Sequence, residues 1–414
     1  TVHRTLNREP LKIFSGSFVF CEAAMTSHSA DATGPGRGVP RLEVAEDAVT
    51  LHWADGRRAV FDSLWLCDNQ PRNRDAHSGQ RLIDIVDLPS VPRIRSALIR
   101  DGELEVNWTQ GTQGARFGLD WLAAQLDPAV SRPELLRRLW TDAGSQDARR
   151  DFAWLTFADW RSSDGKRLSW LVRLLQDGVA FLRDVPRTMD GILEAMQGAG
   201  QVSETNYGRV FDVRSVPQPE NLAYSDLGLG LHTDNPYRDP VPGFQTLHAM
   251  LTPREGGDSL LADGLALAEQ LRADDPASFE VLTRTRVPFH YRSRDADLYA
   301  ERPLIQLACD GAVSAVHYNS RSIAPLPLQG EAACRFYAAY RAFGALLREP
   351  RLQLRLRLGA GELVMFDNQR VLHGRTPFSS SREPRHLRGC YLSRDSVFGM
   401  AALLRRQLAE GLRS

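Results

Sequence analysis

Cysteine is scarce in this chain, and the few cysteines present form no motif. They number five in 414 residues, without a C-x-x-C pair: Cys21, Cys67, Cys309, Cys334 and Cys390. An odd, scattered set of this kind excludes a disulfide framework. It predicts reduced thiols and a cytoplasmic protein.

The chain also lacks an excess of charge of either sign and lacks long apolar runs. Fifty-one basic side chains balance 51 acidic ones, whereas a nucleic-acid binder needs a basic excess. No run approaches the roughly eighteen apolar residues of a membrane span. We therefore expect no nucleic-acid or membrane partner. The 43% hydrophobic and 25% charged fractions are those of a globular protein and leave a small molecule as the expected partner.

Residues 1–40 have the composition of an extension or flexible segment. Basic residues precede a short apolar run, Ile13–Phe20, which Gly16 and Ser17 interrupt. A signal peptide has a longer apolar region. We interpret residues 1–24 as an extension, with a targeting segment as the alternative.

The remaining sequence predicts two domains. A small β-rich N-terminal domain is expected over 41–126, from strand patterns at 42–44, 49–53, 59–61, 83–88 and 104–108. A large domain is expected over 150–414. Its helical spacing falls at 168–176, 189–196, 265–271 and 331–347, and its strand patterns at 179–182, 352–358, 363–366 and 387–392. Many strands with helices outside them predict a mainly β fold with flanking helices, either an antiparallel barrel or a sandwich.

A metal site is indicated by His232-Thr233-Asp234 and by a later histidine, His373. In a strand, alternate side chains share a face, so His232 and Asp234 would point the same way. Two histidines and one carboxylate form the facial triad of non-haem Fe(II) oxygenases, which leaves coordination positions open. The tripeptide alone is common, and a purely structural role is its alternative.

An anion site is indicated by Arg385 and Ser259. Arginine offers a planar, two-pronged donor that suits a carboxylate, and the serine hydroxyl can add a third bond. Arg375, Arg382 and Arg388 are nearby competitors, and an ordinary surface arginine is the alternative for Arg385.

These motifs resemble the γ-butyrobetaine hydroxylase family, within the taurine-dioxygenase-like group of Fe(II)/2-oxoglutarate oxygenases. The matching segments are His232 to Tyr237, Pro242 to His248, Gly257-Asp258-Ser259, Asp367 to Arg375 and Arg385-His386-Leu387. The resemblance implies a distorted double-stranded β-helix (jelly roll) and a homodimer. It implies His232, Asp234 and His373 as iron ligands, with Arg385 and Ser259 holding 2-oxoglutarate. It also implies that O₂ is consumed to hydroxylate an unactivated C–H bond, with release of succinate and CO₂.

The same resemblance implies a pocket for a small zwitterion. An aromatic cage for trimethylammonium would comprise Tyr207, Phe211, Tyr224 and Tyr391, with Phe211 where the animal enzyme has tryptophan. Core packing is the alternative role for these rings. Asn221 and Asn319 would hold the substrate carboxylate. Arg321 could add a cationic donor for a carboxylate or phosphonate, or form a plain salt bridge.

One feature of the family is missing. Its N-terminal module carries zinc on three cysteines and a histidine, but the corresponding positions here are Gln70, Arg72, Asp75 and Thr112. Cys67 alone cannot provide the four ligands of a structural zinc site, so we expect no structural zinc. This departure leaves two alternatives open. The first is the same chemistry on an aminophosphonate, an amino acid or a natural-product intermediate, and the second is a non-catalytic binding protein.

Overall fold

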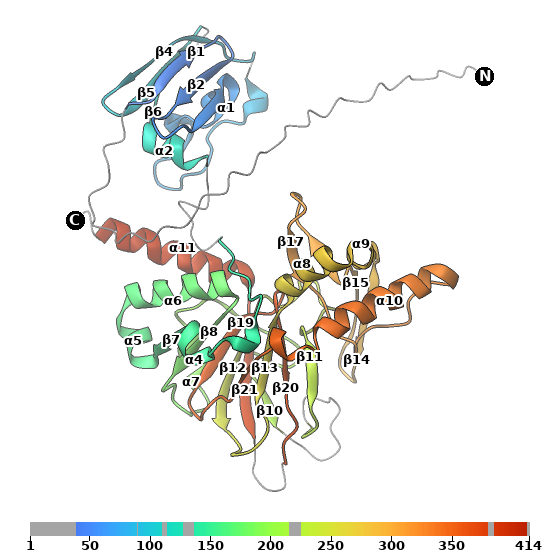
Figure 1. Ribbon diagram of the computed structural model, residues 1–414. Coiled ribbons are helices and arrows are strands. Elements are labelled where there is room, and N and C mark those ends of the chain that lie inside the picture. Colours follow the sequence, from blue (N-terminus) through green and yellow to red (C-terminus); the bar gives the residue numbers. More distant parts are fainter. Residues whose placement is uncertain are drawn as a thin grey trace. The chain divides into compact units, whose positions relative to one another are not determined.

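The computed structural model describes residues 39–88, 90–109, 114–126, 136–214, 225–379 and 385–411. Contacts between residues divide the chain into two compact units, with the boundary after Leu126. Figure 1 shows the helices and strands of each unit.

The first unit consists of two small antiparallel sheets with short helices. One sheet has the order β1 (Arg41–Val44), β2 (Ala48–His52), β3 (Arg58–Asp62), and the other has β4 (Ile94–Arg100), β5 (Glu103–Trp108), β6 (Ala115–Gly118). The helices are α1 (Ser63–Asp68) and α2 (Leu119–Ala124). Alternate residues of the strands, such as Leu51 and Leu104, are fully buried in a shared core.

The strand expected over 83–88 was wrong. Residues Ile85–Asp87 form a 3₁₀ turn instead, and the side chain of Asp84 accepts a hydrogen bond from the Val86 amide at its start. An aspartate that bonds the main chain two residues ahead favours a turn over a strand.

Polar contacts occupy the place where related modules carry zinc. Gln70 is buried and its amide contacts the sulfur of Cys67 at 3.7 Å. Asp75 lies on the surface and accepts hydrogen bonds from the amide and hydroxyl of Ser78, both at 2.7 Å. Thr112 lies outside the described residues.

The second unit is built around a seven-stranded sheet. Its strand order is β10–β21–β12–β19–β8–β7, and β9 also pairs with β21. All pairs are antiparallel except β7–β8. The strands are β7 (Ala153–Thr156), β8 (Val179–Arg183), β9 (Val202–Ser203), β10 (Phe211–Arg214), β12 (Phe244–Leu251), β19 (Leu363–Asp367) and β21 (His386–Leu392).

A four-stranded antiparallel sheet accompanies the larger one. Its order is β11 (Leu229–His232), β20 (Val371–Arg375), β13 (Ser259–Asp263), β18 (Leu354–Leu356). Apolar residues from both sheets, among them Phe181, Leu261 and Phe366, form one buried cluster. The two sheets therefore share an interior, which is the arrangement of a β-sandwich.

Helices cover the outer faces of this sandwich (Figure 1). The larger sheet packs on α5 (Phe157–Ser162), α6 (Asp164–Asp177), α7 (Gly191–Met196) and α11 (Arg394–Gly411) through one apolar cluster. A second cluster joins the smaller sheet to α8 (Gly264–Asp274), α9 (Pro276–Arg284) and α10 (Gly330–Leu346). It also includes the hairpins β14 (Val287–Arg292)–β15 (Asp297–Arg302) and β16 (Ile305–Leu307)–β17 (Val313–Val316). A short helix, α4 (Ala148–Asp151), precedes β7.

This architecture is a mainly β, jelly-roll type domain with flanking helices, as predicted. Among the helices of the described ranges, none combines the length and apolar character needed to cross a membrane.

Candidate active site

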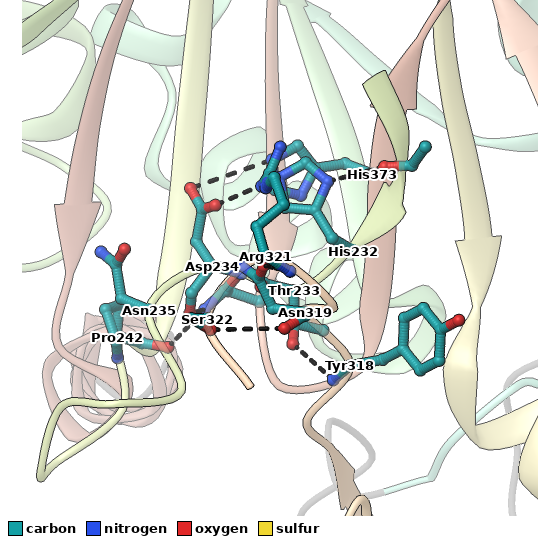
Figure 2. Close-up of polar contacts among 12 residues, drawn as sticks. His232, Thr233, Asp234, Asn235, Pro242, Tyr318, Asn319, Arg321, Ser322 and His373 are labelled. Atoms are coloured by element: carbon teal, nitrogen blue, oxygen red, sulfur yellow. Dashed lines mark hydrogen bonds and ion pairs between the residues drawn. The ribbon is translucent and has the colours of Figure 1, made fainter. Parts of the chain in front are cut away.

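His232 and His373 face each other on neighbouring strands. They are direct partners in the β11–β20 pairing, and their ring centroids lie 4.2 Å apart. Asp234 follows two residues after His232, with its Oδ1 3.3 Å from His232 Nε2 and its Oδ2 3.9 Å from His373 Nε2. One candidate ligand atom from each of the three residues lies within 4.8 Å of the others. Figure 2 shows the Asp234 carboxylate turned toward both imidazoles.

The expectation that all of His232-Thr233-Asp234 lies in a strand was wrong. Strand β11 ends at His232, and Asn235 already has a left-handed φ of 54°. The carboxylate therefore reaches the histidines from the segment after the strand, and contacts outside the β-ladder determine its position.

Protonation at this site suits metal binding. His232 Nδ1 lies 2.8 Å from the carbonyl oxygen of Gly230, and because that oxygen only accepts, Nδ1 donates to it and Nε2 is the nitrogen that faces Asp234. Burial, together with His232, lowers the pKa of His373 to about 3, so its ring is neutral. Burial alone would raise the pKa of Asp234, but the two imidazoles and the Tyr391 hydroxyl outweigh it and lower the pKa. Two imidazoles and one carboxylate are a donor set that fits Fe(II).

The triad opens into a cavity that contains most of the residues expected at the site. Its wall includes Arg385, Ser259 and Arg321, together with the aromatic residues Tyr207, Phe211 and Tyr391. Asn221 and Tyr224 lie outside the described residues. The structure therefore brings the expected iron ligands, the expected anion site and three of the four expected cage rings to one cavity.

Three arginines line this cavity, and their contacts differ. The Nε of Arg385 donates to the Gly257 carbonyl at 3.2 Å, and within the described part of the chain its two terminal nitrogens make no hydrogen bond. Arg375 instead donates to the carbonyls of Ser225 and Leu227. Burial lowers the pKa of both guanidinium groups to about 10, and mutual repulsion adds to this for Arg385. Both stay charged at neutral pH.

The other two competitors for the anion site differ from Arg385. Arg388 hydrogen-bonds the Met189 carbonyl and lies 3.4 Å from Asp212, and it is not part of the cavity wall. Arg382 lies outside the described residues.

Phe211 contacts both of the other rings expected in the cage. Ring centroids are 6.3 Å apart for Tyr207–Phe211 and 5.1 Å for Phe211–Tyr391. The Tyr391 hydroxyl donates to Asp234 Oδ2 at 2.8 Å, so one tyrosine joins the expected cage to the His232–Asp234–His373 cluster. The sequence did not reveal that contact, because it joins residues 157 positions apart.

Asn319 does not line this cavity. Its amide nitrogen donates to the main-chain oxygen of Thr233 at 3.0 Å, and its side-chain oxygen accepts from the Arg321 amide at 3.3 Å. Asn319, which was expected to hold the substrate carboxylate, therefore supports the segment that carries His232 and Asp234, as Figure 2 shows.

Two further polar residues in the cavity wall were missed. Asn235 accepts a 2.6 Å hydrogen bond from Tyr237, whose hydroxyl lies 3.2 Å from that of Tyr207. Gln245 is 2% exposed, and in the described ranges its side-chain oxygen has no hydrogen-bond partner. Asn235 stands within the matching segment His232–Tyr237 and Gln245 within Pro242–His248, so both positions were usable signals.

A buried ion pair fixes the turn before His373. Arg370 and Asp263 are both almost fully buried and form a two-pronged contact at 3.1 and 2.7 Å. Asp263 also accepts from two amides at the start of α8. The first residue of the Arg370-x-x-His373 motif therefore anchors the strand that carries His373 to that helix.

Comparison with known proteins gives a consistent result. A family model described as taurine catabolism dioxygenase TauD, TfdA family matches residues 145–391. A γ-butyrobetaine dioxygenase from Pseudomonas sp. (strain AK-1) is 32% identical over 366 residues, which cover 86% of this chain and 94% of that enzyme. Dioxygenase str8 from Strobilurus tenacellus is 31% identical, over 91% of this chain and 93% of that protein. A crystal structure of asparagine oxygenase with Fe(II), 3-hydroxyasparagine and succinate has a TM-score of 0.46 and 19% identity, covering 57% of this chain and 82% of that chain.

Proposed function

Because this chain belongs to the TauD, TfdA family and is an Fe(II)- and 2-oxoglutarate-dependent dioxygenase, we propose that it hydroxylates a small zwitterion with a quaternary amine. The supporting observation is a single cavity lined by the triad, aromatic rings and arginines. The γ-butyrobetaine dioxygenase to which it is similar is named for such a compound.

In this proposal His232, Asp234 and His373 hold the iron. When bound, Fe(II) with 2-oxoglutarate and O₂ supplies the oxidising power for C–H hydroxylation, with succinate and CO₂ as co-products. The chain's own residues keep the His373 imidazole neutral and hold the Asp234 carboxylate with the Tyr391 hydroxyl. They also hold the substrate carbon in place and exclude bulk water.

Arg385 and Ser259 would hold the far carboxylate of 2-oxoglutarate. Arg385 is 7% exposed, and its bond to Gly257 fixes Nε while the two terminal nitrogens keep their donors for a ligand. Arg375 is less suited, because backbone carbonyls already take its donors. A two-pronged arginine contact provides geometry as well as charge.

The cationic end of the substrate would lie against Tyr207, Phe211 and Tyr391. A quaternary ammonium cannot donate hydrogen bonds, so ring faces are its natural partners. The Tyr237 hydroxyl donates its only proton to Asn235, so in its contact with Tyr207 the Tyr207 hydroxyl must be the donor. The Tyr207 hydroxyl hydrogen therefore points toward Tyr237 and away from a bound cation.

The anionic end would lie at Arg321. The cavity contains three guanidinium groups against the single carboxylate of Asp234. The two positive charges of Fe(II) and the two negative charges of 2-oxoglutarate cancel. The three guanidinium groups then outnumber the Asp234 carboxylate, and this positive excess can attract an anionic group of the substrate. Arg321 makes no hydrogen bond through its side chain in the described ranges, and burial lowers its pKa while Asp234 partly offsets this.

The second candidate keeps the chemistry and changes the substrate. An aminophosphonate would also suit Arg321, since guanidinium binds phosphonate as readily as carboxylate. An amino acid or a natural-product intermediate needs no cage. The loss of the zinc ligands in the N-terminal module is the observation that favours a substrate other than γ-butyrobetaine.

Succinate release tests the proposal directly. The enzyme, supplied with Fe(II), 2-oxoglutarate and O₂, is offered trimethylammonium carboxylates, their phosphonate counterparts and the primary amines. We expect the quaternary amino acids to stimulate succinate formation most. Stimulation by phosphonates alone would instead select the second candidate, and no stimulation by any compound would contradict both.

Three finer assignments complete the proposal. The chain works in the cytoplasm, which is consistent with the free thiols at Cys67, Cys309, Cys334 and Cys390. It forms a homodimer, as the family resemblance implies. Light scattering, which measures the molar mass in solution, tests this assignment. Residues 41–126 form a β-rich module without structural zinc, and 150–414 form the oxygenase domain.

A further inference from the structure

The main chain of Asp234 lies just beyond the end of a strand. Strand β11 stops at His232, so the pairing with β20 no longer provides partners for the residues that follow. A buried main-chain N–H or C=O without a partner costs free energy comparable to a lost hydrogen bond. Another group must therefore bond Asp234 where the ladder has ended.

One side chain supplies both bonds. The Asp234 amide donates to Asn368 Oδ1 at 2.7 Å, and Asn368 Nδ2 donates to the Asp234 carbonyl at 3.0 Å. The same nitrogen also donates to the Pro242 carbonyl at 3.2 Å. Asn368 is fully buried, and its own amide donates to the Gly243 carbonyl at 2.9 Å. Its carboxamide thus acts as a one-residue substitute for a strand partner.

The residue before Asp234 is held in a similar way. The Thr233 amide donates to the Tyr318 carbonyl at 2.8 Å, and the Tyr318 amide donates to the Thr233 hydroxyl at 3.0 Å. Figure 2 shows Tyr318 and Asn319 beside Thr233. Asp234 relies on Asn368 instead, whose carboxamide supplies the donor and the acceptor on two separate atoms.

We propose that Asn368 is a positioning residue that fixes Asp234 for metal binding. The inference rests on the proposed function in that Asp234 is taken as an iron ligand. Asn368 stands in the turn between β19 and β20, five residues before His373. His373 lies on the strand that follows this turn, and Asn368 in the turn bonds the main chain of Asp234. The turn therefore helps to position two of the three expected ligands. A metal site needs its ligands within roughly 0.5 Å of the binding geometry, so loosening that main chain weakens the site.

The neighbouring residue provides a matched control. The Gln369 amide nitrogen donates to the Val241 carbonyl at 3.2 Å, so it ties the same turn to the residue next to Pro242. Within the part of the chain that the structure describes, the Gln369 side chain makes no hydrogen bond to Asp234. If Asn368 serves only to hold the turn, Gln369→Ala and Asn368→Ala will behave alike.

Metal affinity separates these roles. Metal-free enzyme variants are titrated with Mn(II) by calorimetry, and the rise in melting temperature on adding Mn(II) is measured in parallel. We expect Asn368→Ala to bind Mn(II) roughly 10- to 100-fold more weakly, the range seen when support of a metal ligand is lost. Gln369→Ala should bind it normally. Asn368→Ser, which keeps a hydroxyl but cannot span both groups, should also weaken binding.

Other outcomes overturn the inference. Normal Mn(II) affinity in both Asn368 variants, or failure of both to fold without metal, would make Asn368 a residue of the fold alone. Asp234→Ala serves as the reference. If it binds Mn(II) like the wild type, the ligand assignment itself has failed. If it loses Mn(II) while Asn368→Ala does not, only the positioning role has failed.

Discussion

Tyr391→Phe removes one hydroxyl group and leaves the aromatic ring in place. That hydroxyl donates to Asp234 Oδ2 at 2.8 Å, and Tyr391 is 4% exposed, so water cannot readily replace it. Burial and the Asp234 charge raise the pKa of Tyr391 well above its ordinary value, so it keeps the proton that it donates. A hydrogen bond to a charged group contributes about 1.5–3 kcal/mol.

The hydroxyl bonds Asp234 in the metal-free protein too, so that free energy sets an upper limit of about 10- to 150-fold on the loss of metal affinity. We expect Tyr391→Phe to weaken Mn(II) binding to the metal-free enzyme within this limit, because the carboxylate is held less firmly, and to lower kcat. The KM for a quaternary amine should hardly change, because the ring face remains. Tyr207→Phe is the matched control, since its hydroxyl contacts Tyr237 at 3.2 Å and not the carboxylate. A higher substrate KM with unchanged metal affinity would refute the reasoning, because the hydroxyl would then serve the substrate.

Three other predictions test separate parts of the site. His373→Ala should abolish turnover while circular dichroism shows an intact fold; near-normal activity at full iron occupancy would contradict the triad. Arg385→Lys should raise the KM for 2-oxoglutarate far more than that for the substrate, since lysine lacks the two-pronged contact. An unchanged value would shift the role to Arg375. Gly389→Ala should weaken binding of the quaternary amine, because an added Cβ would lie 2.4 Å from Phe211 Cε2 and force that ring to move. Calorimetry with the amine and its neutral tert-butyl isostere should show a loss confined to the cation.

The sequence predicted the elements in which local pattern and tertiary contacts agree. The helix expected at 331–347 is α10 (Gly330–Leu346), and the strand expected at 363–366 is β19 (Leu363–Asp367). Helix α11 was not predicted, although Val397, Ala401 and Leu404 recur at helical spacing and are buried. The charged residues of this segment made its short apolar stripe difficult to recognise as a helical pattern.

The site was predictable as a set of residues but not as a set of contacts. The resemblance carried by the motifs selected His232, Asp234, His373 and Arg385, and one cavity contains them all. The support of Asp234 could not be found in this way. Asn368 contacts it across 134 positions, and the end of β11 that makes the contact necessary has no marker in the local pattern.

The position of β10 at the edge of the larger sheet has a consequence for protein engineering. Phe211 begins this edge strand and Tyr207 lies in the turn before it, whereas Arg385 directly precedes β21 and Tyr391 lies near its end. Strand β21 has partners on both sides. A directed-evolution library limited to positions 207 and 211 can therefore explore new substrates without replacing any residue proposed to hold iron or 2-oxoglutarate.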